Sequence, residues 1–357
     1  LEAVHKSNIT ALAISEDSAY AVSADSQMIC IWSLQTKKCI LKIPNPHKNL
    51  ENPENGEKSE NPISCLKITP DSKQLVSVSA DCSIAVWNMV DGFLVQRMEK
   101  AHEASLTCLD FLDQGSTLVT GSEDNSVSLW NIKQKSKIHT FEKVTKDKVS
   151  SMAITNDQKT LIVGSKGGDL AIFDLEHKIK THEFQKENAH KKSVKSITVS
   201  SNDEYFVTSS DDDTIALWSL QGKKSAHTFT AGHLGSISFL NAGGEEEVTS
   251  VGSDKAIRFW NYATKKKIDG SDTDVEKNII TAAPAEGQSF LVLTEDLKLY
   301  TVSEKTLSEK CVIFPHQEKI TCMTYNPTKK LLATGSEDRS ISILDLESNI
   351  VIHQFAD

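Results

Sequence analysis

Histidine, aspartate and hydroxyl residues recur together along this chain, and these are the side chains of a hydrolase triad. His190, Thr208 and Asp212 form one such set, and the same order of residue types returns in several other stretches. An enzyme needs a catalytic triad only once, whereas this set is repeated. The repetition therefore predicts a structural role, in which each buried Asp keeps the hydrogen-bond partners that burial requires. We expect no catalytic residues.

The sequence also lacks the short motifs of cofactor and metal chemistry. It contains no G-x-G-x-x-G, no P-loop and no H-E-x-x-H. The two glycines that follow Lys166 are expected to supply positive φ in a turn rather than a phosphate cradle. The seven cysteines include no C-x-x-C pair, and Cys65, Cys108 and Cys322 share one small-residue position of a repeat. We expect reduced, packed thiols, no metal site and no cofactor.

Aromatic residues impose a period on the elements that must position these side chains. Successive marker residues lie 40–45 residues apart, after a first interval of 55, at Trp32, Trp87, Trp130, Phe173, Trp218, Trp260, Tyr300 and Leu344. A repeat of this length with an aromatic residue near its end is typical of a β-propeller. One blade cannot bury its own faces, so each blade must stack on its neighbours.

The third repeat shows the expected strands most clearly. Residues 106–111 alternate between apolar and polar types, residues 117–121 are mostly apolar, and 127–130 and 137–141 follow after turns. Alternation with a period of two, separated by turn residues, predicts four antiparallel strands. Four such strands make one blade, and the same order recurs eight times along the chain.

Spacing within the repeats is equally regular. Asp124 lies six residues before Trp130, Thr120 lies four residues before that Asp, and His102 opens the repeat. In this pattern the chain resembles the WD40-repeat family over nearly its whole length, although the Trp-Asp dipeptide itself never occurs. The resemblance implies that these four residue types form a buried hydrogen-bonded chain within a blade. We expect it to be complete in repeats three, five and six, partial in one, two and eight, and absent in seven and in four, where Gly167 replaces the Asp.

We therefore predict an all-β fold, a WD40-type β-propeller of four-stranded antiparallel blades, with eight blades and seven as the alternative. It is expected to occupy residues 1–357 as a single propeller. Residues 44–62, rich in Pro, Asn, Glu and Lys, are predicted to be a flexible insert between blades one and two, either a partner-ordered arm or a tolerated loop. The approximate blades are 1–43, 59–98, 99–143, 144–186, 187–229, 230–270, 271–314 and 315–357.

Composition narrows the class of partner. The formal net charge is −10, and only Arg97, Arg258 and Arg339 are arginines. This balance argues against direct nucleic-acid binding, which needs a positive field and favours arginine. No apolar run approaches the ~20 residues that span a membrane, and the first residues do not resemble a signal peptide. We expect no membrane association and a cytoplasmic location, with the nucleus as the alternative.

The resemblance also implies that the face carrying the His and Asp loops binds partners. The predicted partner-binding rim has charges of both signs and comprises Lys6, Asn8, Glu103, Glu123, Lys146, Lys148, Lys191, Asp211, Lys319 and Glu337. Mixed charge suits other proteins or peptides better than a polyanion. We predict a non-enzymatic protein–protein interaction scaffold, present as a monomer within a multiprotein hetero-complex.

Two alternatives stay open at this point. A peptide-motif reader, such as a ubiquitin-ligase substrate receptor, would use Lys146, Lys148 and Lys191 against an acidic or phosphorylated motif. The second alternative is an RNA-binding propeller, which would need a continuous lysine stripe, or a propeller enzyme, which would need acids or histidines clustered in its channel.

Overall fold

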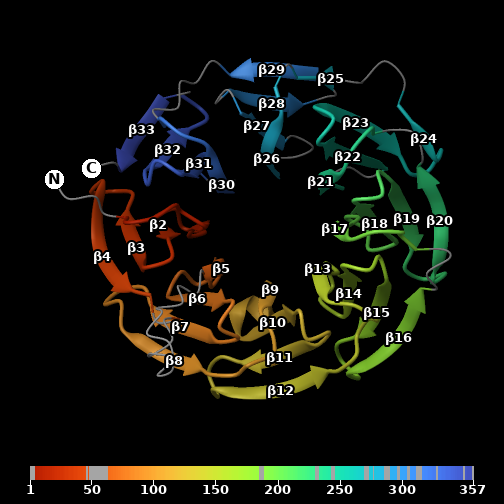
Figure 1. The fold of residues 1–357 in the computed structure, drawn as a ribbon, viewed down its shortest axis with the longest axis horizontal. Helices are drawn as coiled ribbons and strands as arrows, with labels where there is room; N and C mark the ends of the chain where they lie inside the picture. The colour runs from red at the N-terminus through yellow and green to blue at the C-terminus, as the bar shows by residue number, and fades with distance from the viewer. Residues whose placement is uncertain are drawn as a thin grey trace, which may run out of the picture. The chain divides into compact units, whose positions relative to one another are not determined.

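A computed structural model of the chain shows an all-β fold built from eight antiparallel sheets (Figure 1). Seven sheets have four strands and one has an additional short strand, and in each the first four strands are hydrogen-bonded in chain order. The predicted WD40-type propeller with eight blades is thereby confirmed. The structure describes residues 5–45, 47, 63–184, 189–229, 233–242, 246–268, 273–275, 277–284, 290–295, 298–303, 306–310, 316–326, 329–348 and 350–355.

The chain divides into two compact units, which are described separately. The first comprises Leu1–Val119, Asn131–Ser136 and Lys310–Asp357, and the second comprises Thr120–Trp130 and Lys137–Glu309. The dividing line passes through the third sheet, which consists of β9 (Leu106–Leu112), a 3-10 turn (Asp113–Gly115), β10 (Thr117–Ser122), β11 (Val127–Asn131) and β12 (Ser136–Phe141).

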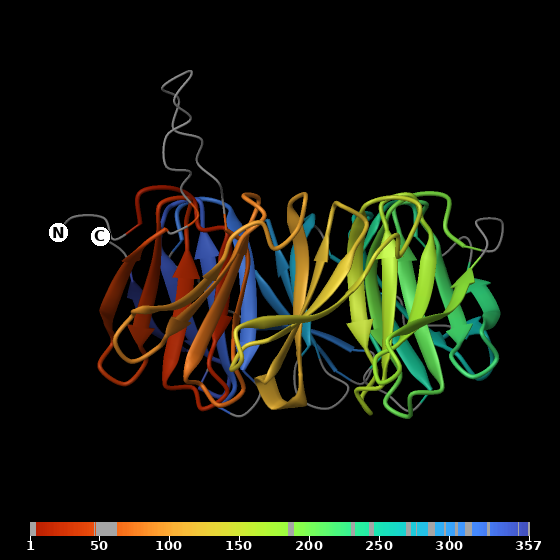
Figure 2. The same ribbon diagram turned by 90° about the horizontal axis from the view of Figure 1, so that it is seen from below.

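The first unit contains blades one, two and eight. Blade eight lies directly beside blade one, so that the C-terminal sheet and the N-terminal sheet are neighbours (Figures 1 and 2). The strands of these three blades are β1 (Ala11–Ile14), β2 (Tyr20–Ala24), β3 (Met28–Ser33), β4 (Lys38–Pro44), β5 (Ile63–Ile68), β6 (Gln74–Ser79), β7 (Ile84–Asn88), β8 (Leu94–Met98), β30 (Ile320–Asn326), β31 (Leu331–Ser336), β32 (Ile341–Asp345) and β33 (Ile350–Phe355).

The second unit contains blades four to seven, which follow one another along the chain. Their strands are β13 (Val149–Ile154), β14 (Thr160–Ser165), β15 (Leu170–Asp174), β16 (Ile179–Phe184), β17 (Val194–Val199), β18 (Tyr205–Ser210), β19 (Ile215–Ser219), β20 (Lys224–Phe229), β21 (Ile237–Asn241), β22 (Glu247–Gly252), β23 (Ala256–Asn261), β24 (Lys266–Lys267), β25 (Thr273–Asp274), β26 (Ile279–Pro284), β27 (Phe290–Thr294), β28 (Leu299–Ser303) and β29 (Thr306–Lys310).

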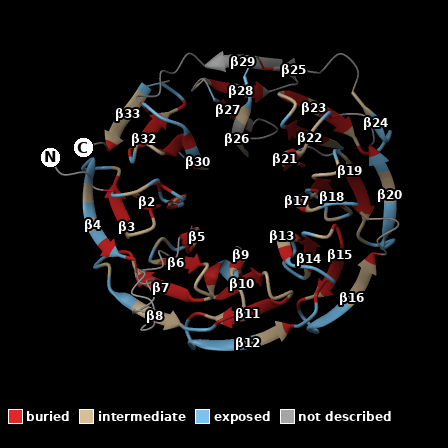
Figure 3. Cartoon of the chain, viewed as in Figure 1, coloured by how far each residue is buried: buried red, intermediate tan, exposed pale blue. Residues whose placement is uncertain are grey.

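Burial follows the position of a strand within its sheet. The second strand of a blade is buried along nearly its whole length, as in β10 and β14, whereas the fourth strand exposes much of its surface, as in β12 and β16 (Figure 3). Strands covered on both faces need apolar side chains throughout, which explains their near-continuous apolar runs. The described residues hold no helix with the length and apolarity that spanning a membrane requires.

Neighbouring blades pack through aromatic residues. The Phe that ends the fourth strand contacts the marker residue of the next blade, as in Phe184 with Trp218, whose ring centroids are 4.5 Å apart, and Phe141 with Phe173 at 4.8 Å. Such contacts contribute about 0.5–1.5 kcal/mol each beyond the area they bury. These contacts explain why a Phe recurs at the end of the fourth strand.

A hydroxyl at the start of the first strand joins one blade to the next. Thr321 Oγ1 of blade eight donates to the Ile9 carbonyl oxygen in blade one at 2.6 Å, and Ser150 Oγ of blade four donates to the Val194 carbonyl oxygen in blade five at 2.7 Å. The register of the first strand shifts at Ser150, which is the residue left unpaired by a β-bulge. The bulge frees this position to bond across the blade boundary.

The predicted insert at 44–62 begins later than the sequence indicated. Pro44 ends β4, and the Asn45 backbone amide donates to the Gln27 carbonyl oxygen at 2.7 Å. His47 is fully buried. The remaining residues of this prediction, 46 and 48–62, lie outside the described residues.

Candidate partner-binding rim

The His, hydroxyl, Asp and Trp residues of blade five form one connected polar chain. Trp218 Nε1 donates to Thr208 Oγ1 at 2.8 Å, and Thr208 Oγ1 lies 2.7 Å from His190 Nε2. His190 Nδ1 lies 2.9 Å from Thr214 Oγ1 and 3.3 Å from Asp212 Oδ1. Because the indole can only donate and the carboxylate can only accept, we assign the His190 proton to Nδ1.

This chain does not have the geometry of a nucleophile and its base. Thr208 is fully buried, and its hydroxyl is held between the indole and the imidazole. A nucleophile must reach a substrate, and this one cannot. Within the described ranges, no group of three His, Cys, Asp or Glu residues gathers in a way that could hold a metal ion. In blade five the set holds buried polar groups together by hydrogen bonds.

Blade six repeats the arrangement, and blade one does so in part. In blade six, His233 Nδ1 lies 2.8 Å from Asp254 Oδ1. In blade one, His5 Nε2 lies 2.7 Å from Ser23 Oγ, whereas His5 Nδ1 lies 3.1 Å from Asp25 Oδ2 without making a hydrogen bond within the described residues. The chain of hydrogen bonds in blade one is therefore partial, as predicted.

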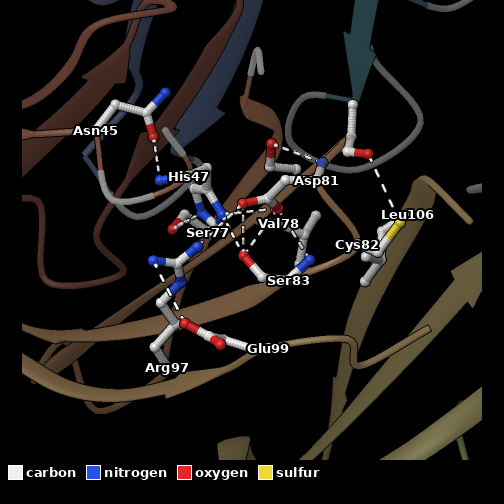
Figure 4. A network of polar contacts seen from close by, with 12 residues as sticks. Asn45, His47, Ser77, Val78, Asp81, Cys82, Ser83, Arg97, Glu99 and Leu106 are labelled. Carbon is white, nitrogen blue, oxygen red and sulfur yellow. Dashed lines mark hydrogen bonds and ion pairs between the residues drawn. The ribbon is translucent and has the colours of Figure 1, made fainter. Parts of the chain in front are cut away.

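Blade two is also complete, through a residue that the sequence did not reveal. His47 Nε2 lies 2.9 Å from Ser77 Oγ, and His47 Nδ1 lies 3.2 Å from Asp81 Oδ1 (Figure 4). Trp87 Nε1 donates to Ser77 Oγ at 3.1 Å, and Arg97 Nη2 lies 3.4 Å from Asp81 Oδ2. The prediction of a partial chain in blade two is therefore wrong.

Loop length hid His47 from the sequence analysis. Elsewhere the opening His lies 17 or 18 residues before its hydroxyl partner, as with His190 and Thr208, but His47 lies 30 residues before Ser77. The additional residues belong to the insert that follows His47. The available signal was the Asp81–Trp87 spacing, which called for an opening His upstream.

Blades eight, three and seven differ in how much of the chain can be described. In blade eight, His316 Nε2 lies 2.9 Å from Thr334 Oγ1, but Leu344 replaces the Trp, which confirms the predicted partial chain. In blade three, Trp130 Nε1 donates to Thr120 Oγ1 at 2.9 Å. In blade seven, residue 296, the Asp of the shortened turn, lies outside the described residues.

The turn Asp also fixes the backbone of the rim. Its Oδ2 accepts a hydrogen bond from the backbone amide of the residue after the opening His, at 2.7–2.9 Å. The side chains of these residues are exposed, while their backbones are held from beneath. The four pairs are Lys6 with Asp25, Lys191 with Asp212, Leu234 with Asp254, and Gln317 with Asp338.

The same hydrogen bonds stabilise the charged form of each turn Asp. Burial alone would raise the pKa of these carboxyls, but hydrogen bonds from neighbouring side chains and backbone amides outweigh it. The pKa of Asp25 falls to about 2, and those of Asp81, Asp212, Asp254 and Asp338 also lie below the ordinary value. Burial lowers the pKa of His316, which is therefore neutral near pH 7.

The charged rim residues of the second unit neutralise one another. Lys148 Nζ and Lys166 Nζ both donate to the Glu123 carboxylate, at 2.8 and 2.5 Å, and the two lysines lower the pKa of Glu123. Lys195 Nζ lies 3.0 Å from Asp211 Oδ2. Lys148 is therefore paired and is not a free cation beside Lys146 and Lys191. This pairing weakens the alternative of a peptide-motif reader, which needed these three lysines to bind an acidic motif.

In the first unit the predicted rim residues lie on the same two kinds of loop. The Glu337 backbone amide donates to the Lys319 carbonyl oxygen at 2.9 Å, so the turn and the entry loop of blade eight are directly joined. Lys6, Asn8 and Glu103 are exposed on the entry loops of blades one and three. Lys146 is exposed on the corresponding loop of blade four in the second unit.

The sequence analysis missed Leu234 as a rim residue. Its side chain is 92% exposed, although it occupies the same Asp-clamped position as Lys191 in the preceding blade. A leucine held in water on a rigid backbone is available to an apolar partner surface. The signal was present in the sequence, because the position after each opening His can be read directly.

Comparisons with known proteins agree with this architecture. Residues 60–244 match the family model described as nucleolar protein 10-like, N-terminal domain, and residues 3–33 and 308–345 match the WD domain, G-beta repeat. The crystal structure of the computationally designed protein Ika8 aligns with a TM-score of 0.74 over 95% of this chain and 96% of that chain, at 17% identity. This last likeness concerns the fold alone.

Three natural relatives illustrate the range of similar proteins. Protein hir-1 of Neurospora crassa is 26% identical over 43% of this chain, and Periodic tryptophan protein 2 of Arabidopsis thaliana is 22% identical over 44%. The p21-activated protein kinase-interacting protein 1-like of Danio rerio is 24% identical over 47%. The matched regions span 13%, 18% and 55% of these relatives. The chain belongs to the WD40-repeat β-propellers and, through residues 60–244, to the family of nucleolar protein 10-like N-terminal domains.

Proposed function

We propose that this chain is a non-enzymatic scaffold that holds protein or peptide partners of a multiprotein assembly on its rim. The Asp-clamped backbone carries this proposal. In four blades a buried carboxylate fixes the amide of an exposed rim residue, so that the rim presents its side chains from a rigid frame. A preordered surface loses little conformational entropy when a partner binds.

The chemistry of the rim favours a protein partner over a polyanion. Lys148 and Lys166 are paired with Glu123, and Lys195 is paired with Asp211, so the rim of the second unit lacks a continuous positive stripe in its described part. Leu234 adds an exposed apolar side chain at the Asp-clamped position of blade six. Apolar anchors surrounded by paired charges are typical of protein–protein interfaces.

The test is affinity purification from the native source, with nuclease added, followed by mass spectrometry. The parent chain is compared with a double variant, Lys191→Glu with Leu234→Asp, which changes two exposed side chains at equivalent rim positions. We expect a stoichiometric set of proteins with the parent and loss of at least one member with the variant. Size-exclusion chromatography with light scattering should show the purified chain as a monomer.

The matched control is Lys178→Glu with Ile179→Asp, which makes the same kinds of change at exposed positions where the fourth strand of blade four begins. This control should keep the whole set. Loss of partners from the control but not from the rim variant would place the binding surface elsewhere. If no stoichiometric protein co-purifies with the parent, the scaffold proposal is overturned.

The location of the protein belongs to the same proposal. The cytoplasm was the first expectation and the nucleus the alternative, and the description of the matching family as nucleolar supports the nucleus. We propose a nuclear assembly. Imaging of the chain tagged at its native locus tests this, and a signal confined to the cytoplasm would contradict it.

A further inference from the structure

A pocket of about 490 Å³ lies between blade eight and blade one, away from the rim, and every residue that lines it belongs to the first unit. It is formed by the first and third turns of blade one together with β31, β32 and β33 of blade eight. We propose that this pocket binds an acidic peptide segment of a partner protein, which inserts one apolar side chain between the two blades. The proposal concerns a second surface and goes beyond the rim.

The pocket exists because of the residues at this blade junction. At the junction of blades five and six, Tyr205 and Tyr262 pack against each other with their ring centroids 5.4 Å apart. Leu331 and Leu34 occupy the corresponding positions at the junction of blades eight and one, and both line the pocket. Two leucines fill less space than two tyrosines, and the volume lies within the roughly 300–1,000 Å³ of ligand pockets.

The floor of the pocket is apolar and well supported. Ile343 and Phe355 line it and are 1% and 7% exposed, and Phe355 packs against Trp32 with the ring centroids 4.4 Å apart. Ile352 lies on β33 at the bulge opposite β32 and also lines the pocket. An inserted aliphatic or aromatic side chain would gain about 25 cal/mol for each Å² of apolar surface that it removes from water.

One buried polar atom at this site calls for a partner. Ser18 lines the pocket and is only 5% exposed, and within the described part of the chain its hydroxyl has no hydrogen-bond partner. Buried hydroxyls are normally satisfied, because an unsatisfied one costs about 1–3 kcal/mol. A carbonyl or carboxylate oxygen of a peptide could accept a hydrogen bond from the Ser18 hydroxyl.

The charges around the pocket favour an anion. Lys37 and Lys329 line it with exposed side chains, and Lys37 Nζ donates to the Ile352 carbonyl oxygen at 3.3 Å, which holds the ammonium beside the pocket. Asp17 also lines the pocket, but it accepts hydrogen bonds from Ser15 Oγ at 2.6 Å and from the Ala19 backbone amide at 3.0 Å. These hydrogen bonds hold the Asp17 carboxylate in its own turn, and the nearby Lys329 ammonium offsets part of its charge. The two lysines still outnumber this one acid among the residues that line the pocket.

His353 completes the polar lining in its neutral form. Burial and the nearby Lys37 ammonium both lower the pKa of His353, which therefore carries no charge near pH 7. Lysines on turns of two different blades, with a buried hydroxyl between apolar walls, suit a peptide with acidic groups on both sides of an apolar side chain. A simple fatty acid would offer a charge at one end only.

The test measures binding of short probe peptides to the full chain by NMR. The probes are acetyl-Glu-Leu-Glu-amide, acetyl-Lys-Leu-Lys-amide, acetyl-Glu-Ala-Glu-amide and octanoate, with the His353 ring and the isoleucine methyl groups as reporters. We expect the first probe to bind with a millimolar dissociation constant and to shift His353 and Ile352. The lysine and alanine probes should bind at least fivefold more weakly.

Two variants establish where the probe binds. Leu34→Tyr with Leu331→Tyr fills the pocket as blades five and six fill theirs, and it should abolish binding. Lys329→Glu should weaken binding of acetyl-Glu-Leu-Glu-amide at least fivefold, whereas Lys42→Glu, on the exposed face of β4, should not. Lys329→Glu changes an exposed side chain and keeps the test decisive if the filled variant does not fold.

Three outcomes would overturn the inference. The first is equal binding of the glutamate and lysine probes. The second is binding that survives both the filled pocket and Lys329→Glu. The third is binding of octanoate without binding of any peptide, which would make the ligand a fatty acid. The rim variant Lys191→Glu with Leu234→Asp should bind the probe normally, so failure of the rim proposal would leave this result unaffected.

Discussion

Blades four and five are neighbours in the second unit, and they stabilise the same turn in opposite ways. Blade five links His190, Thr208, Asp212 and Trp218 by hydrogen bonds. Blade four has Val163 and Phe173 at the positions of the Thr and the Trp, Gly167 at the position of the Asp, and no opening His. Its apolar pair neither donates nor accepts a hydrogen bond.

The difference teaches that a blade can lose the polar chain as a whole, whereas blade eight loses only its Trp and keeps the contact between His316 and Thr334. Removing only the hydroxyl would orphan the buried indole, whereas exchanging both for apolar side chains leaves neither of them unsatisfied. Blade four does retain a buried acid, Asp169, whose backbone amide donates to Ser165 Oγ at 2.9 Å. This acid lies two residues beyond Gly167, and it replaces Thr214 of blade five rather than Asp212.

The largest effect is expected where the turn of blade four meets blade five. Gly168 has a φ of +92°, and a Cβ built on it would lie 2.1 Å from the His190 carbonyl oxygen. Gly168→Ala would combine left-handed backbone strain with overlap against main chain. We expect it to lower the free energy of unfolding by about 3–5 kcal/mol, measured by urea denaturation followed by circular dichroism.

Gly167→Ala is the matched control for this prediction. A Cβ at Gly167 would come within 3.0 Å of Asp147 Cβ, a side chain on an exposed loop that can move. Its cost should stay below about 1 kcal/mol. Similar losses for the two variants would mean that the turn of blade four does not depend on close approach to His190.

The second prediction concerns the carboxylate that blade four lacks. Asp212→Ala removes the acceptor for His190, for Thr214 and for the Lys191 backbone amide. We expect a loss of about 3 kcal/mol with no loss of any chemical activity, measured by the same denaturation. Asp211→Ala, which breaks an exposed ion pair with Lys195, should cost less than about 1 kcal/mol.

A small effect of Asp212→Ala would contradict this account of blade five. Equal effects of Asp212→Ala and Asp211→Ala would do so even more directly, because the two residues are adjacent in sequence and differ mainly in burial and partners.

Much of this comparison was readable from the sequence. The aromatic period predicted eight blades, and the spacing of Asp212 and Trp218 predicted the polar chain of blade five, because those relations are local in sequence. Of the two glycines expected to have positive φ, Gly168 has it and Gly167 does not. The period of a sequence shows which residues occupy equivalent positions in successive repeats. The number of blades, the polar chain of blade five and the turn glycine all depend on such equivalent positions.

Other features depend on contacts that periodicity does not encode. His47 was missed because the insert separates it from its blade, although the contact itself is ordinary. The pocket beside Leu34 and Leu331 depends on side-chain volume across a blade boundary, which no single repeat reveals. The pairing of Lys148 and Lys166 with Glu123 likewise joins residues of different repeats.

The third prediction introduces the apolar pair of blade four into blade five. Made alone, Thr208→Val orphans the buried Trp218 indole, whereas Trp218→Phe removes one of the two partners of the Thr208 hydroxyl. Made together, they remove donor and acceptor at once. The loss for Trp218→Phe should therefore be about 1 kcal/mol smaller in the Thr208→Val background than in the parent.

A double-mutant cycle on the four purified proteins measures this coupling. His190 still loses its hydroxyl partner in the double variant, so the compensation is incomplete. Strictly additive losses of unfolding free energy would show that the hydroxyl and the indole of blade five are not energetically coupled. The difference between blades four and five would then need another explanation.

The smallest effect is the pH dependence of the Asp212 contribution. Hydrogen bonding lowers the pKa of Asp212 in the folded chain despite its burial, so the unfolded chain binds a proton first as the pH falls. The stability that Asp212 supplies is therefore complete above about pH 5 and is lost as the pH falls below about 4.

The difference in unfolding free energy between the parent and Asp212→Ala should be equal at pH 7 and pH 5 and about 1 kcal/mol smaller at pH 3. A difference that stays constant to pH 3 would mean that the carboxylate is not held in its charged form by His190 and Thr214, and a difference that grows would reverse the sign of the argument.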